Sequence, residues 1–191
     1  MAMTKDDRQP FVAHLERLRD ADDRAALAAL RRGLGKPPGS ALEMHRYVVP
    51  WLAEQERPWA DAVHYLVASL FALHPQPGGS GSMGTALARV AASTGAESTE
   101  RRFVGLLNCH GDDLPRHLRQ AVSLAKAHDV PIDWHRLFGD LMGWNHHSRY
   151  VQRQWARDYW SLSRPVQEAE GEAHDEARAP EGARRVGRAG R

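Results

Sequence analysis

The residues of this chain whose types and spacing suggest chemistry are arginines, placed in pairs or at helical intervals. Arg149, Arg153 and Arg157 fall four apart, so on a helix each lies about 40° round from the last and the three form one basic face. Six more complete the set: Arg31, Arg32, Arg101, Arg102, Arg116 and Arg119. Guanidinium groups on several helices can line a groove that follows a phosphate backbone and binds it without reading sequence. We therefore predict that these nine arginines bind nucleic acid.

Each arginine cluster taken alone also fits an ordinary solvated helix surface. On such a surface arginines commonly pair with carboxylates, as Arg102 could with Glu100. A helical adaptor whose basic face binds an acidic protein partner is therefore the alternative function. Spacing alone leaves both interpretations open.

The segment from Gly79 to Gly84 (GSGSMG) matches the dinucleotide-binding pattern G-x-G-x-x-G letter for letter. That pattern binds a pyrophosphate only when a buried strand leads directly into its first glycine. The run before Gly79 has the apolar period of a helix and is separated from it by Pro75 and Pro77. We therefore predict a loop that leads into a helix, and no nucleotide site.

The histidines and the single cysteine form no recognisable metal or catalytic motif. Cys109-His110 and His146-His147 are adjacent pairs, and adjacent positions on a helix point about 100° apart, so neither pair converges on one ion. No H-x-x-x-H or C-x-x-C spacing occurs. We expect Cys109 to be a buried small apolar residue, and we expect no catalytic residue, no metal and no cofactor.

Composition fits one globular domain. The chain has 191 residues, 42% of them apolar, and six Trp, which is enough to bury a sizeable core. No apolar run approaches the roughly 18 to 20 residues that a bilayer span needs, and the first residues form no secretory segment, so we expect a cytoplasmic protein. The net charge is only +2, but acids cluster near the start while basic residues lie mostly in the second half.

Apolar periodicity predicts helices nearly everywhere, and no two-residue alternation rich in β-branched residues predicts a strand. We predict an all-α fold, a compact bundle of about eight or nine helices in two packed sub-bundles. Their expected starts are Pro10, Asp22 or Asp23, Ser40, Pro58, Met83, Thr99, Asp112 or Asp113, Asp133 and Ser148. The predicted boundaries are a flexible N-terminus over 1–9, a helical domain over 10–162 with a loop at 75–82 between the sub-bundles, and a disordered tail over 163–191.

The last predicted helix carries a second stripe. Val151, Trp155 and Tyr159 also fall four apart, on roughly the opposite side from the arginines. We predict that these three side chains fix the helix to the core. Trp134 lies in a similar apolar stripe, so we expect it in the core as well and not as a platform for stacked bases.

The order of motifs along the chain resembles the CasB family, the small subunit of the type I-E CRISPR surveillance complex, Cascade. The segments that carry the resemblance are Ser82 to Ala88 (SMGTALA), Glu100 to Phe103 (ERRF), Leu118-Arg119, Val130 to Trp134 (VPIDW) and Gln152 to Trp155 (QRQW). Leu30 to Arg32 and Tyr47 to Trp51 agree more loosely, so the resemblance covers about Phe11 to Trp160. The loop at 75–82 and the long tail depart from the shorter members of the family.

The resemblance implies a helical, non-enzymatic protein that is present as two copies within Cascade. Such a subunit contacts the backbone subunits and the large subunit, and helps to hold the guide RNA and the target DNA, including the displaced strand. R-loop formation is nearly balanced in energy, so a strip of arginines that neutralises the displaced strand can favour it. Arg31-Arg32, Arg101-Arg102, Arg119 and the arginines of the final helix match basic places in the family pattern.

Overall fold

The computed structural model of this chain describes residues 9–55, 57–94 and 96–163. These ranges contain nine α-helices, two short 3-10 helices and no strand, which confirms the predicted all-α fold. The α-helices are α1 (Pro10–Asp20), α2 (Arg24–Arg31), α3 (His45–Val48), α4 (Pro58–Leu73), α5 (Met83–Thr94), α6 (Ala96–Asn108), α7 (Leu114–Ala127), α8 (Trp134–Met142) and α9 (Tyr150–Ser163). The 3-10 helices are Leu42–Met44 and Val49–Trp51. Nearly all of the predicted flexible N-terminus and disordered tail lies outside the described residues.

Several helices begin where local chemistry predicts. Pro10 and Pro58 occupy first-turn positions of α1 and α4, where a missing N–H costs nothing. Asp23 and Asp133 cap α2 and α8, and their carboxylates accept the backbone N–H of the residue three positions on, each at 2.9 Å. The predicted start at Ser40 is wrong. Its hydroxyl donates to the Pro37 carbonyl at 2.7 Å, within a turn of the preceding loop, and the next helix begins later with a 3-10 segment.

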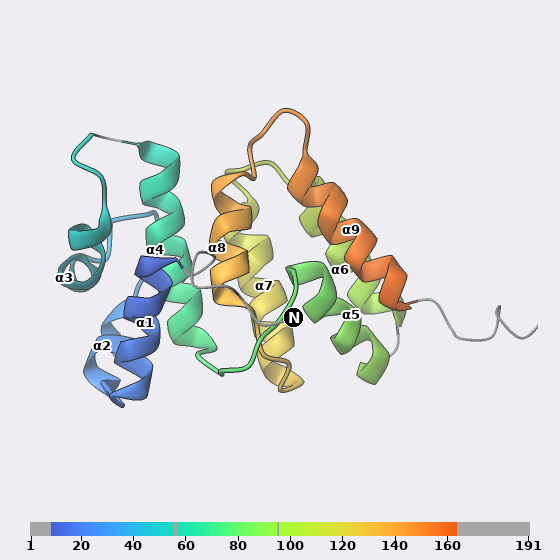
Figure 1. Ribbon diagram of the computed structural model, residues 1–191, viewed down its shortest axis with the longest axis horizontal. Coiled ribbons are helices and arrows are strands. Elements are labelled where there is room, and N and C mark those ends of the chain that lie inside the picture. Colours follow the sequence, from blue (N-terminus) through green and yellow to red (C-terminus); the bar gives the residue numbers. More distant parts are fainter. Residues whose placement is uncertain (1–8, 56, 95, 164–191) are drawn as a thin grey trace, which may run out of the picture.

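The helices are arranged in two groups that share α7 and α8 between them (Figure 1). Helices α1 to α4 lie on one side, and α5, α6 and α9 lie on the other. Helix α8 comes after the 75–82 loop in the sequence, yet it packs against α4, which comes before that loop. The most extensive packing between two helices is that of α5 against α9.

Aromatic side chains join these helices in the core. Phe71 of α4 meets Trp134 of α8 with ring centroids 5.5 Å apart, and Phe103 of α6 stacks on Tyr159 of α9 at 4.4 Å. Trp134 is 3% exposed, so its predicted core position is confirmed. No helix among the described residues has the length and apolar character required to cross a membrane.

Close packing explains two glycines of the Gly79–Gly84 segment. A β-carbon on Gly79 would lie 2.0 Å from the Ile132 carbonyl carbon, and one on Gly84 would lie 2.1 Å from the Trp155 carbonyl oxygen. The element before the segment is the helix α4, so the strand that a dinucleotide site requires is replaced by a helix. These two glycines therefore allow backbones to approach, which accounts for them without a bound phosphate.

Candidate nucleic-acid interface

Helix α9 is fixed to the bundle by the apolar stripe that its sequence predicts. Val151 is 1% exposed, and Trp155 and Tyr159 are fully buried. The Trp155 indole Nε1–H donates to the Asp140 carboxylate of α8 at 2.7 Å. The prediction that this stripe anchors the helix is therefore confirmed.

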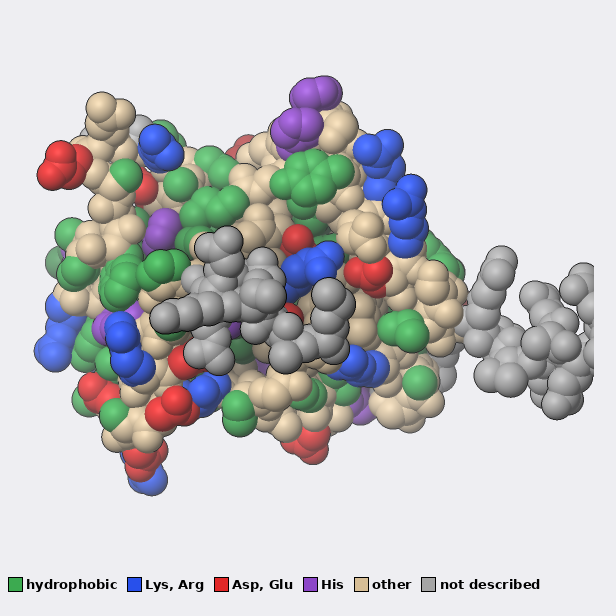
Figure 2. All heavy atoms as spheres, viewed as in Figure 1, with side chains coloured by type: hydrophobic (Ala, Val, Ile, Leu, Met, Phe, Trp, Pro, Cys, Tyr) green, Lys and Arg blue, Asp and Glu red, His purple; other side chains and the backbone are tan. Residues whose placement is uncertain are grey.

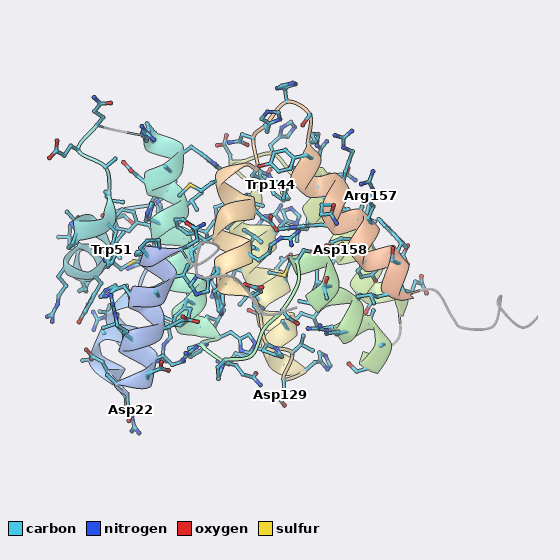
Figure 3. The ribbon with its side chains drawn as sticks, in the orientation of Figure 1. Asp22, Trp51, Asp129, Trp144, Arg157 and Asp158 are labelled. Atoms are coloured by element: carbon cyan, nitrogen blue, oxygen red, sulfur yellow. The ribbon has the colours of Figure 1, made fainter. Side chains whose placement is uncertain are left out.

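The outer side of α9 carries Arg153 and Arg157, both exposed. Figure 3 shows Arg157 on the outside of the helix, while its neighbour Asp158 lies on the inner side. There the Asp158 carboxylate accepts the hydroxyl of Ser82, the residue just before α5, at 2.5 Å. Neither arginine forms an ion pair within the described part of the chain. Basic side chains stand together at this end of the molecule, whereas elsewhere on the same face basic and acidic side chains are interspersed (Figure 2).

Arg149 does not extend this basic face, so the predicted three-arginine stripe is wrong at its first member. The helix begins at Tyr150, and Arg149 precedes it with a φ of 49°, in the left-handed region. Its guanidinium donates instead to the Leu107 carbonyl in the last turn of α6. Arg149 belongs to the turn that precedes α9, in which its backbone N–H donates to the His146 carbonyl at 2.8 Å. Its side chain therefore does not continue the helical spacing of Arg153 and Arg157.

The structure brings three of the predicted arginines into one groove. Arg102 of α6 and Arg116 and Arg119 of α7 line a shallow depression of about 630 Å³. Its remaining lining residues are Gln120, Ser123, Leu124 and Ala127. We call this feature the α6–α7 groove.

Two of the three guanidinium groups in the α6–α7 groove lack a neutralising partner. Arg102 and Arg119 form no ion pair with any described residue, while Arg116 lies 3.8 Å from Asp113. Glu100, the partner that sequence spacing offers Arg102, instead accepts the Trp160 indole N–H at 3.4 Å. The groove therefore presents unpaired positive charge, which is the property that a phosphate backbone recognises.

The other predicted arginines lie outside this groove. Arg32 pairs with Glu43 at 2.8 Å and Arg101 with Glu97 at 3.1 Å, both at exposed positions. The Arg31 guanidinium donates to the Leu27 carbonyl one turn back at 3.3 Å. The sequence thus placed most of the arginines on helices correctly, with Arg32 just after α2 and Arg149 just before α9, but it did not distinguish the paired ones from those that converge.

Sequence reasoning missed Gly35 and Lys36. Both lie in the loop after α2, and a β-carbon on Gly35 would stand 2.7 Å from Nη1 of Arg119. Gly35 has a φ of 74°, so both backbone conformation and space favour glycine there. The sequence does indicate Gln120 and Ser123 of the groove, because they follow Arg116 and Arg119 at helical spacing and so lie on the same face of α7.

No other described cluster suggests metal or thiol chemistry. Within the described ranges, no three His, Cys, Asp or Glu side chains lie close enough to hold a metal ion. Cys109 is half-buried against the core, and burial raises the pKa of its thiol, with Asp113 acting in the same direction. A raised pKa favours the unreactive thiol over the thiolate.

Comparison with known proteins identifies the family. The family model for the CRISPR-associated protein Cse2 matches residues 26–160.

The chain belongs to the Cse2 family.

A Cse2 protein of Thermus thermophilus is 39% identical to this chain over 151 residues, which is 78% of this chain and 86% of the relative. The crystal structure of CasB from M. ruber superposes with a TM-score of 0.70, at 30% identity, over 87% of this chain and 98% of that one. A chain in a CRISPR RNA-guided surveillance complex matches with a TM-score of 0.67, at 30% identity, over 86% and 95%. The predicted membership of the CasB family is therefore confirmed, and the α6–α7 groove lies within the matched segment of this Cse2 chain.

Proposed function

We propose that this Cse2 chain is a non-catalytic small subunit of a type I-E Cascade complex that binds nucleic acid through its arginines in antiviral defence. The observation that carries the binding role is the α6–α7 groove, where Arg102 and Arg119 lie on different helices and form no ion pair with a carboxylate of the described residues. Membership in the complex is supported by the similarity to a chain of a CRISPR RNA-guided surveillance complex over 86% of this chain.

In this proposal the subunit acts as an electrostatic clamp. Guide RNA pairing with one DNA strand is nearly balanced against the lost DNA duplex, so contacts to the backbones of the guide, the target strand and the displaced strand can favour the R-loop. Each phosphate neutralised by an arginine releases counterions, so on duplex DNA the slope of log affinity against log salt becomes more negative by about 0.9. Such binding is independent of sequence, as a subunit that must accept any guide requires.

Contacts with protein belong to the same proposal. Large apolar side chains lie exposed outside the α6–α7 groove, among them Leu42 at 72%, Val49 at 49% and Leu162 at 59%. They offer surface for the backbone subunits, the large subunit and a second copy of the chain, while leaving the groove open.

Titration of the full chain at two salt concentrations tests the binding role. Arbitrary single-stranded and duplex DNA should bind, and binding should weaken steeply as salt rises. The double variant Arg102→Gln and Arg119→Gln should bind more weakly to every sequence and flatten the salt slope by about 1 for each arginine that contacts a phosphate. The control is Arg101→Gln, which removes an arginine already paired with Glu97 and should change the slope less.

The alternative function makes the opposite prediction. A chain whose basic face binds an acidic protein would show no salt-dependent binding to arbitrary DNA or RNA. An unchanged salt slope in the double variant would remove the α6–α7 groove from the proposed interface.

A further inference from the structure

A second cavity opens beside the α6–α7 groove. It has a volume of about 380 Å³ and lies between the Gly33–Gly39 loop, helix α4 and the start of α7. This volume falls in the range of about 300 to 1,000 Å³ that is typical of small-molecule sites. Arg119 lines both this cavity and the groove, so the two adjoin at that side chain.

The walls of the cavity are apolar and include an aromatic ring that is held in place. The Trp59 indole Nε1–H donates to the Leu141 carbonyl of α8 at 3.0 Å, which fixes the ring of this α4 residue against α8. Gly111 lies against this ring, since a β-carbon there would stand 3.4 Å from the indole Cζ3. Pro38, Leu66 and other apolar residues form much of the remaining lining. A flat apolar group could therefore bind without the loss of conformational entropy that ordering the Trp59 side chain would require.

Charge is confined to a few lining residues. Lys36 and Arg119 are exposed cations, and Asp112 is an exposed acid. Neither cation forms an ion pair with a described residue. An apolar interior with two cations at its edge, beside a groove lined by further arginines, is complementary to a base attached to a phosphate backbone.

We propose that this cavity takes one unstacked nucleobase from a strand that lies in the α6–α7 groove, with the neighbouring phosphates on Lys36 and Arg119. The inference rests on the proposed function, because it requires a strand in the groove. The base packs in the apolar interior beside Trp59, and the Asp112 carboxylate can accept a hydrogen bond from an exocyclic amine. A partner protein's apolar side chain is the competing occupant, but it gives the adjacent arginines no role.

Filling the cavity without changing charge tests the inference. Ala62 lines the cavity from α4 and is partly exposed, so Ala62→Phe places a ring in the space that the base requires. The matched control is Ala28→Phe, at an exposed position of α2 that lines neither cavity nor groove. Two probes of equal length are used with the full chain: a single-stranded oligonucleotide, and an abasic phosphodeoxyribose strand that keeps the charges but has no bases.

We expect Ala62→Phe to bind the base-bearing strand about tenfold more weakly than wild type, and the abasic strand equally well. Ala62→Leu fills less of the cavity and should show a smaller loss, and it provides the test if the phenylalanine variant does not fold. Ala28→Phe should bind both strands as wild type does.

The outcomes separate the cavity from the proposed function. If wild type binds neither strand, the proposed function fails. If wild type binds both but the variants at Ala62 bind the base-bearing strand equally well, or lose affinity for both strands alike, the cavity inference alone is overturned. It is also overturned if those variants keep their strand binding and instead lose the ability to assemble with other subunits, because the occupant is then a protein side chain.

Discussion

Gly84 and Trp155 lie so close that no side chain fits between them. A β-carbon on Gly84 would stand 2.1 Å from the Trp155 carbonyl oxygen and 2.8 Å from its carbonyl carbon. This contact joins α5 to α9 at the buried side of the basic helix, so the position of α9 and its arginines depends on a glycine that precedes Trp155 by 71 positions.

Gly84→Ala should therefore push α5 and α9 apart. We expect a loss of about 1 to 3 kcal/mol in the free energy of unfolding, as for other overpacked cores, measured by urea denaturation. The control is Gly139→Ala in α8, where an added β-carbon meets nothing within 4 Å. That change should raise the free energy of unfolding by up to about 1 kcal/mol, because alanine favours a helix over glycine. Equal stability of the two variants would contradict the close packing.

Gly35→Ala should affect both stability and nucleic-acid binding. Its φ of 74° strains any L side chain at a cost of roughly 1 to 2 kcal/mol, and the methyl group would displace the Arg119 guanidinium. The control Gly78→Ala has a φ of 91° but meets nothing within 4 Å, so it should lose similar stability and keep wild-type affinity for single-stranded DNA. If both variants bind as wild type, the place of Arg119 is not set by Gly35.

Arg149→Gln should lower stability without changing the salt slope of nucleic-acid binding. The variant loses the guanidinium hydrogen bond to the Leu107 carbonyl, which we expect to cost about 1 kcal/mol in urea denaturation. Arg153→Gln, at an exposed position without an ion pair to a described residue, should do the reverse, with a flatter salt slope and stability within about 0.5 kcal/mol. If both variants flatten the salt slope equally, Arg149 contacts nucleic acid as Arg153 does.

Asp140→Asn should change how stability depends on pH. Burial raises the pKa of the Asp140 carboxyl above its ordinary value of 3.8, despite the opposing effects of Trp155 and Arg136. Between pH 3.8 and the folded-state pKa, the folded chain therefore holds a proton that the unfolded chain has released, and the stability contributed by Asp140 is lost as pH rises through the folded-state pKa.

The asparagine variant lacks this titration, and its amide oxygen can still accept the Trp155 N–H. We therefore expect the free energy of unfolding of Asp140→Asn, relative to wild type, to increase as the pH is raised from 3.8 toward neutrality. Urea denaturation at several pH values measures the difference. A difference that falls as pH rises would show that the Asp140 pKa is lowered in the folded protein.

Much of the fold follows from the sequence because the signals are local. Asp23 and Asp133 cap helices through an N–H only three residues away, and the proline starts act within a single turn. The Ser40 start failed because its hydroxyl had a competing partner in the preceding turn. The groove was predictable only in part, since the spacing of Arg116 and Arg119 marks one face of α7 but carries no information about Arg102 on α6.

Residue types and spacing were enough to locate most helices, the buried stripe of α9 and most of the arginines on helix surfaces, because these depend on residues within one or two turns. Which arginines meet depends instead on how the helices pack. Arg102 and Arg119 share a groove because α6 packs on α7, and Arg149 leaves the α9 face because the Leu107 carbonyl, 42 residues away, accepts its guanidinium. Contacts between distant segments are set by how the helices pack, and no spacing within one helix encodes them.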